Sequence, residues 1–487
     1  METQKKYVYV IDIIAMFFMF VFGKIVPPFG PVTDVGVGMI GVFIGLVLLT
    51  VCTKHMFFAT LMSMIAMIYC GYTTANDAFV SWLGNSTIAT FIFVSAFVVA
   101  LRETGAMNVL AKKILSLKVL HGRPKLFIAA FLLTTFVISM FLKFAPTIVL
   151  MFGLFESIRD ICGYDKKDAF CKYILLGLFM ACMGSYALPF MGIQMTSIAL
   201  ANSAMEAYGI VFNEMTYFVT NVAIFVPWLL IYTLGLGKIL KCDLNPLKNL
   251  DITQAESMKE ISDKFNGRQK IMMGVFAFCI AELVLTALCP AAPVISVFAK
   301  LGTGWIWVAV LAVLSIFTLG GKPVVVPQKV LEPTMWNIVC MIGAFSMLGS
   351  AIASEELGIR NWIIDVISPI FGNMSLPVML ILVVVVITLA TNFLNGLPLT
   401  LAMTATVLPF VCQMQLDYGI SASVMGTIFN VCANMAYLTA AGSIYSSLIL
   451  GREEMDTKWI WTKGLVVLCG FMIVTICVGL VLCYLLP

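Results

Sequence analysis

Two short polar breaks inside long apolar runs carry the side chains best suited to chemistry. The first, SMFLKFAPTIVLMFG (139–153), contains Lys143, and the second, TNFLNGLPLTLAMTATVLP (391–409), contains Asn392 and Asn395. An ammonium group in apolar surroundings costs on the order of 3 kcal/mol to insert, so it is normally paired or placed in a wet cavity. Such a group could bind an anion, while amide and hydroxyl oxygens could coordinate a cation such as Na+.

The two breaks share one sequence frame. Aligned on Phe141 and Phe393, they are offset by 252 residues (393 − 141), which places Lys143 opposite Asn395. Broken apolar segments at matching positions in two halves indicate the binding site of a repeat-built carrier. Chance similarity between apolar segments is the alternative, and the agreement of spacing and breaks makes it the weaker one.

A helix that begins just past each break would direct backbone N–H groups toward it. Proline suits a first helical turn, and Pro146 and Pro398 stand at matching positions (398 − 146 = 252). Two positive helix ends facing one cavity favour an anion. We therefore predict a substrate site formed by Lys143, Ala145, Pro146, Thr147, Asn395, Gly396, Pro398 and Thr400. Two proline-kinked spans without a ligand are the alternative, because kinks are common in membrane helices.

A second irregular piece follows each break. GSYALPFMGIQMT (184–196) and NMAYLTAAGS (434–443) both interrupt a span, and Tyr186 and Tyr437 fall in nearly the same frame (437 − 186 = 251). Both pieces could close the site and contribute to cation binding. The predicted ion-binding residues are Asn392, Asn395, Gly184, Ser185, Asn434, Thr439, Gly442 and Ser443. Close helix packing through small residues is the alternative.

The composition defines the elements that must position these residues. The chain has 487 residues, of which 61% are hydrophobic and 11% charged, against about 25% charged in soluble proteins. The apolar runs recur along the whole chain and predict an all-α polytopic membrane protein with about 11 transmembrane helices. The fourteen cysteines show no CxxC spacing, and HExxH, P-loop and GxSxG motifs are absent. We therefore expect no enzyme activity, no cofactor or metal beyond a possible coupling Na+, and no nucleic-acid partner.

Positive charges in the connections predict the topology. Lys5 and Lys6 place the N-terminus in the cytoplasm, and the stretch 125–158 lies between two basic clusters, so it enters and leaves on the cytoplasmic side. Glu355 and Glu356 lie outside, so 376–412 enters from the opposite face. The fold is thus expected to be an inverted-repeat carrier with two opposed re-entrant hairpins. Its predicted parts are an N-terminal span and loop (1–35), a first repeat (36–240), a cytoplasmic linker (241–268) and a second repeat (269–487).

These segments resemble the divalent anion:sodium symporter (DASS) family of the ion transporter superfamily. Besides the two breaks, WLGNSTIATFIFVSAFVVALRETGAMNVLAKKIL (82–115) and LTAAGSIYSSLIL (438–450) are similar to the family, over roughly 36–487. The resemblance implies elevator-type carriers, usually dimers, that move dicarboxylates, citrate or sulfate. It also implies Ser-Asn-Thr at both hairpin tips, where these residues bind sodium and substrate carboxylates. Here the first triplet is Lys143-Phe144-Ala145, and the second is Asn395-Gly396-Leu397 or, counted from Pro409, Leu399-Thr400-Leu401.

Lys143 is then the most informative residue. Our hypothesis is that its charge replaces the missing sodium and faces an anionic substrate, and that it could also carry a coupling proton; a lysine that snorkels or pairs for structure alone is the alternative. We expect a secondary carrier of a small anion, a di- or tricarboxylate, coupled to Na+ or H+, in the cytoplasmic membrane as a homodimer. A cation/proton antiporter, an oxyanion efflux permease of the same superfamily, and a non-transporting membrane assembly partner or sensor remain open.

Overall fold

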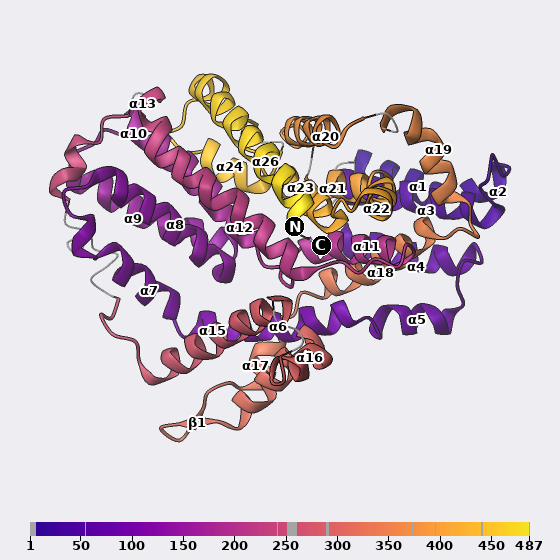
Figure 1. Ribbon diagram of the computed structural model, residues 1–487, viewed down its shortest axis with the longest axis horizontal. Helices are drawn as coiled ribbons and strands as arrows, with labels where there is room; N and C mark the ends of the chain where they lie inside the picture. The colour runs from indigo at the N-terminus through magenta and orange to yellow at the C-terminus, as the bar shows by residue number, and fades with distance from the viewer. Residues whose placement is uncertain are drawn as a thin grey trace.

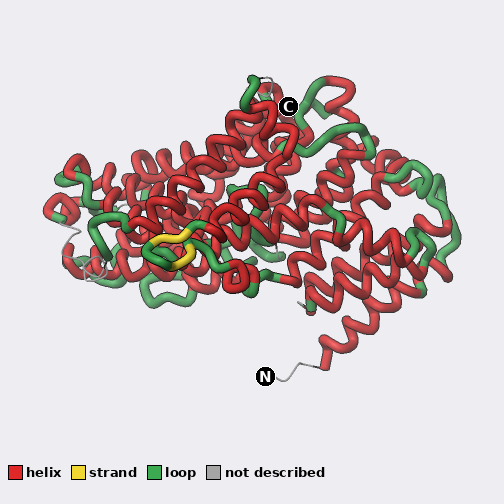
Figure 2. Tube along the Cα trace, turned by 90° about the horizontal axis from the view of Figure 1, so that it is seen from below, coloured by secondary structure: helices red, strands yellow, loops and turns green. Residues whose placement is uncertain are grey.

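The computed structural model describes residues 6–53, 55–240, 242–250, 261–288, 292–371, 374–394, 396–439 and 442–486. Asn395, Lys5 and the part of the predicted linker at 251–260 lie outside the described residues. Within them the protein is built of helices (Figures 1 and 2), with one short antiparallel ribbon of β1 (Thr318–Leu319) and β2 (Lys322–Pro323).

The helices fall into two series, one on each side of the predicted linker. The first series is α1 (Lys6–Phe20), α2 (Phe22–Ile25), α3 (Asp34–Leu48), α4 (Met56–Tyr69), α5 (Ala75–Leu83), α6 (Ser86–Glu103), α7 (Ala106–Leu115), α8 (Pro124–Leu142), α9 (Phe144–Cys162), α10 (Ala169–Ala181), α11 (Gln194–Glu206), α12 (Glu214–Ile231) and α13 (Gly237–Ile239). The second is α15 (Gly267–Leu288), α16 (Ile295–Ile316), α17 (Pro327–Leu331), α18 (Trp336–Ala353), α19 (Ile359–Phe371), α20 (Leu376–Ala390), α21 (Gly396–Thr406), α22 (Leu408–Tyr418), α23 (Ala422–Ala433), α24 (Ile444–Leu450), α25 (Thr457–Trp459) and α26 (Leu465–Leu485).

Many of these helices are suited to a bilayer. Among the described residues, six are long and apolar enough to cross a membrane, or up to eight if each of two bent helix pairs is one span. Five shorter apolar helices accompany them. Large apolar side chains such as Ile473 and Val481 on α26 stay exposed, which suits contact with lipid. The predicted count of about 11 spans remains a prediction.

The first break lies at the joint of α8 and α9. Only Lys143 separates the two helices, and their outer ends meet the same end of the α12 segment. Lys125 Nζ, at the start of α8, donates to the Leu234 carbonyl at 3.0 Å. Tyr164 Oη, just after α9, donates to the Asp243 carbonyl at 2.8 Å. The chain therefore turns back on itself at Lys143.

The second break lies between α20 and α21. The outer ends of this helix pair lie near a different part of the molecule from those of α8 and α9. The outer ends approach the C-terminal part of α26: a Leu380 methyl lies 3.4 Å from the position of a Cβ built on Gly479, and Ser421 N donates to the Cys483 carbonyl at 3.0 Å. The ring of Phe393 at the break instead lies 6.2 Å from that of Trp461, just before α26. A further bend of 47° separates α21 from α22, which the sequence analysis did not predict.

The segments before the breaks also correspond. Helices α6 and α18 each have 18 residues. Each is followed by a glycine with left-handed backbone, Gly105 (φ 65°) or Gly358 (φ 71°), at an offset of 253 (358 − 105). Next comes an amphipathic helix, α7 or α19. Gly358 is also required sterically, because a Cβ would lie 1.8 Å from the Pro31 carbonyl oxygen.

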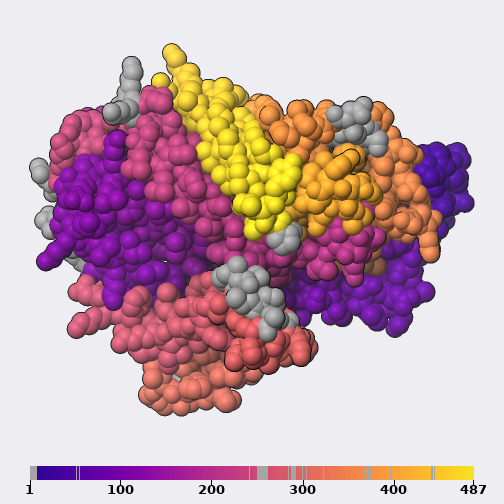
Figure 3. Space-filling view, in the orientation of Figure 1, coloured from indigo at the N-terminus to yellow at the C-terminus, as the bar shows by residue number. Residues whose placement is uncertain are grey.

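Buried side chains form two apolar cores. The smaller core joins the N-terminal helices α1, α3 and α4 to α18, and the larger one holds α6–α12 and most of α20–α26. Figure 1 places α1–α4 at one end of the long axis and α8–α10 at the other. In the space-filling view of Figure 3, the yellow C-terminal segment crosses the face between these ends.

Candidate functional site

Lys143 has an unusual backbone. Its φ of 65° and ψ of 173° make it the only non-glycine residue with positive φ in the described part of the chain. This region is essentially restricted to glycine and costs a residue with a side chain about 1–3 kcal/mol. The nearest polar contact of its half-buried ammonium group is Met335 Sδ at 3.6 Å. No carboxylate among the described residues forms an ion pair with Lys143.

The first joint packs on the irregular piece that follows α10. Ser139 Oγ donates to the Ala181 carbonyl at 3.2 Å, and the Phe144 ring stacks on Tyr445 with centroids 4.1 Å apart. Gly184 approaches so closely that a Cβ would lie 2.2 Å from the Phe136 carbonyl oxygen. A glycine at 184 is therefore a packing requirement of the joint.

The second break makes the equivalent contact. Thr391 Oγ1 donates to the Ala433 carbonyl, and both positions are offset by 252 from Ser139 and Ala181 (391 − 139 and 433 − 181). Gly396, the first residue of α21, lies so close to the backbone at the end of α23 that a Cβ would lie 2.0 Å from the Ala433 oxygen. The same carbonyl-binding device therefore anchors each break to its neighbouring broken span.

Asn392 is buried and fully engaged. Its Oδ1 accepts hydrogen bonds from Tyr437 N at 2.9 Å and Leu438 N at 2.8 Å, and its Nδ2 donates to the Thr388 carbonyl at 2.7 Å. The Thr439 hydroxyl donates to the Asn392 carbonyl. With both lone pairs of Oδ1 in use, the amide side chain in this conformation holds segment 434–439 against the break.

The remaining predicted substrate residues differ in exposure. Ala145 and Pro146 are exposed, whereas Thr147, Gly396, Pro398 and Thr400 are buried. The Thr147 hydroxyl has no hydrogen-bond partner in the described part of the chain; the Thr400 hydroxyl donates to the Gly396 carbonyl at 3.0 Å. Helices α9 and α21 begin at Phe144 and Gly396, two residues before the prolines where we expected them to start. Each proline is therefore the third residue of its helix, within the first turn.

The predicted ion-binding residues lie around both breaks. Ser185 is buried beside the first joint with its hydroxyl unpartnered among the described residues. A Cβ on Gly442 would lie 2.7 Å from the Thr391 carbonyl oxygen, and Ser443 caps α24 in a reciprocal capping box. Asn434 Nδ2 donates to Asn430 Oδ1 at 2.7 Å. These residues line the broken spans, and Asn395 lies outside the described residues.

Four residues near the breaks were not predicted from the sequence. Asn430 Nδ2 donates to Ser197 Oγ at 3.0 Å, a direct hydrogen bond between the two halves, and Tyr445 and Met335 contact the first joint. The polar residues Ser197 and Asn430 inside apolar runs were a usable signal. The sequence carries no signal for Tyr445 and Met335, because aromatic and apolar residues are common in membrane helices.

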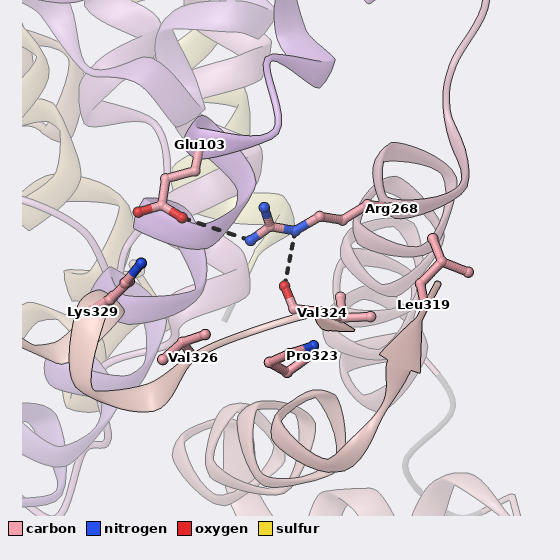
Figure 4. Close-up of a pocket in the computed structure, with 7 residues that line it drawn as sticks. All are labelled: Glu103, Arg268, Leu319, Pro323, Val324, Val326 and Lys329. Atoms are coloured by element: carbon pink, nitrogen blue, oxygen red, sulfur yellow. Dashed lines mark hydrogen bonds and ion pairs between the residues drawn. The ribbon is translucent and has the colours of Figure 1, made fainter. Parts of the chain in front are cut away.

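A cavity of about 380 Å³ lies at the end of α6. It is lined by Glu103, Arg268, Leu319, Pro323, Val324, Val326 and Lys329 (Figure 4). No cluster of three or more His, Cys, Asp or Glu side chains suited to a metal ion occurs among the described residues.

Comparison with known proteins supplies the class. The structure is similar to that of the YdaH transporter of Alcanivorax borkumensis, with a TM-score of 0.54 and 14% identity, over 85% of this chain and 88% of that one. That similarity concerns the fold. Residues 43–426 match the family model described as "Citrate transporter". A comparison with curated proteins found no match.

These matches, with the apolar helices, define an all-α, multi-pass membrane protein that is a secondary transporter and not an enzyme. The matched segment covers most of the chain, so this protein belongs to the citrate transporter family.

Proposed function

We propose that this protein is a secondary carrier of small carboxylate anions, di- or tricarboxylates such as citrate, coupled to Na+ or H+. The observation that carries the proposal is Lys143. A strained, half-buried lysine without a carboxylate partner in the described part stands where two helices meet. Uncompensated charge inside a membrane protein normally marks a substrate or ion pathway.

The geometry of the two helix pairs supports alternating access. The outer ends of α8 and α9 meet the α12 segment near Leu234 and Asp243, while those of α20 and α22 approach the far end of α26. Connection 451–456, which precedes α26, pairs with residues near the end of α9. Two re-entrant hairpins that open to opposite faces are therefore part of the proposal, with movement of elevator type in the DASS branch of the superfamily.

Membrane orientation follows from charge. Basic connections at 102–125, 159–172 and 238–270 favour the cytoplasmic side, because positive residues are retained there. We propose a protein of the cytoplasmic membrane with the N-terminus inside, which functions as a homodimer as the resemblance to the symporter family implies. The first joint lacks the side chains that bind sodium in that family, so a proton is the simpler coupling ion there.

Citrate uptake into proteoliposomes tests the proposal. Inward Na+ or H+ gradients would each be imposed alone, with succinate and sulfate as competing anions. We expect gradient-driven citrate uptake that Lys143→Ala abolishes and Lys143→Arg partly retains, because a positive charge is needed. Uptake by K143A at the wild-type rate and with the same ion dependence would refute the role of Lys143. Failure of every gradient and anion would refute the carrier function itself.

A further inference from the structure

The cavity at the end of α6 has more positive than negative charge. Arg268 Nε donates to the Val324 carbonyl at 2.9 Å, which fixes the guanidinium plane. Its NH2 group lies 3.6 Å from Glu103 Oε2, and the two side chains are 37% and 43% exposed. An ion pair this long and this exposed contributes about 0–1 kcal/mol. A stronger carboxylate ligand can therefore displace Glu103 from Arg268.

Lys329 supplies a second cation to the same cavity. It lies on α17, its side chain is exposed, and no partner for its ammonium group occurs among the described residues. Figure 4 shows Lys329 beside Glu103, on the same side of the Arg268 guanidinium. Arg268 and Lys329 together with Glu103 leave a net charge of +1. A fixed guanidinium fork next to an ammonium group suits a carboxylate anion.

A short stretch of chain connects the cavity with the surroundings of Lys143. Met335 is six positions after Lys329, so their Cα atoms are at most about 22 Å apart, and Met335 contacts the Lys143 ammonium group. Arg102 directly precedes Glu103 and adds a further positive charge at the end of α6. The end of α6 and the joint of α8 and α9 therefore both carry positive side chains. Aligned charge of one sign raises the local concentration of an oppositely charged solute and its rate of encounter.

We propose that this cavity is a second anion site, a vestibule on the cytoplasmic side that holds a carboxylate between bulk solvent and Lys143. Glu103 acts as an internal carboxylate that occupies Arg268 when the vestibule is empty. The passage of the carboxylate from this cavity to Lys143 rests on the proposed function, whereas anion binding in the cavity can be tested separately. The ligand class is a small di- or tricarboxylate.

A cysteine reporter in the cavity tests binding directly. Val326→Cys keeps all three charges, and Val119→Cys on an exposed turn is the matched control. In the full-length protein in nanodiscs, modification by a thiosulfonate reagent would be followed at each engineered site by peptide mass spectrometry, with citrate as the probe. We expect half-saturating citrate to slow modification of V326C about twofold and to leave V119C unchanged. Arg268→Gln should remove this protection, and Glu103→Gln should produce it at lower citrate.

The outcomes separate the two proposals. Protection of V326C that survives in a K143A background, where uptake is lost, supports an independent vestibule. Equal modification of V326C with and without citrate overturns the vestibule, even if citrate is transported. Protection without any transport by the wild-type protein supports the anion site and refutes the carrier function. In a working carrier, R268Q/K329Q should raise the KM for citrate on the cytoplasmic face on the order of tenfold and leave the outer face unchanged.

Discussion

At the scale of single residues, Lys143 combines a charged side chain with a backbone conformation that is otherwise adopted almost only by glycine. Backbone strain of this kind persists only where the surrounding structure imposes it, and it clusters at functional sites. The strain arises because α9 must start immediately after α8 ends, with Lys143 as the only residue between them. A glycine would serve that turn better. The presence of lysine at this position therefore supports the proposal that the ammonium group has a role at the joint.

A pair of substitutions separates strain from charge. Lys143→Gly should raise the free energy of unfolding by about 1 kcal/mol or more, because it relieves the positive φ. Lys143→Ala should leave that strain in place, and both variants should lose citrate uptake. Thermal unfolding in detergent, measured beside uptake in proteoliposomes, checks both effects. Equal stability of K143G and K143A would show that the turn is not strained.

Asn392 illustrates a residue that acts by positioning others. Asn392→Ala would leave the buried N–H groups of Tyr437 and Leu438 without acceptors, at a cost of about 2–3 kcal/mol or more. Thermal unfolding should therefore show a clear loss of stability. The matched control is Asn245→Ala, whose side chain is exposed and bonds only within its own turn, and it should remain near wild type. A N392A protein as stable as N245A would contradict this role.

At the scale of elements, an ion-pair cluster ties the end of α9 to the connection before α25. Arg159 and Arg452 each lie 3.0 Å from Glu454 Oε1, and Arg452 also pairs with Glu156 on α9. The Glu454 side chain is only 4% exposed. Burial disfavours its charge, but the hydrogen bond from Arg452 and the positive charges of Arg452 and Arg159 prevail and hold the pKa of Glu454 below its ordinary value. The cluster thus joins the two halves of the chain at one face.

Removing this carboxylate should weaken the junction in a pH-dependent way. Glu454→Gln leaves two guanidinium groups without their shared partner and should destabilise the protein by about 3 kcal/mol. Because the folded pKa is lowered, the stabilisation is present above the ordinary carboxylate pKa and is lost as pH falls through the folded value. Unfolding curves of wild type and E454Q should therefore converge in acid. The neighbouring exposed pair Lys166–Glu453 provides the control, and E453Q should leave stability unchanged.

Much of the element arrangement could be predicted from sequence, and the reasons for the remainder are specific. The positions of the two breaks follow from polar residues and prolines inside apolar runs, which hydropathy detects. The bend between α21 and α22 falls at Val407, two residues before Pro409 in the first turn of α22. Pro409 was a usable signal for this bend, but a local pattern does not give the bend angle. The hydrogen bonds of the Asn392 side chain depend on segment 434–439, about 45 residues further along the chain. Long-range hydrogen bonds of this kind cannot be predicted from local pattern.

At the scale of the whole molecule, the contacts of the two breaks make the halves comparable. Ser139 with Ala181 and Thr391 with Ala433 repeat one hydrogen bond at one offset. Repetition of a tertiary contact is stronger support for a duplicated architecture than similarity of apolar sequence alone. The halves are not isolated, because Asn430 bonds to Ser197 across them. A carrier of this design would move its substrate at the junction of the two repeats.

Opposite entry of the two helix pairs is the property on which this mechanism depends. Asp160 on α9 and Asp417 on α22 are both exposed and mark the outer ends of the two pairs. Asp160→Cys should be modified by a membrane-impermeant thiol reagent only after cells are permeabilised, whereas Asp417→Cys should be modified in intact cells. Peptide mass spectrometry distinguishes each engineered cysteine from the fourteen native ones. Reaction of both sites from the same compartment would mean that the pairs open to one face, and no alternating-access cycle could then connect the two sides through them.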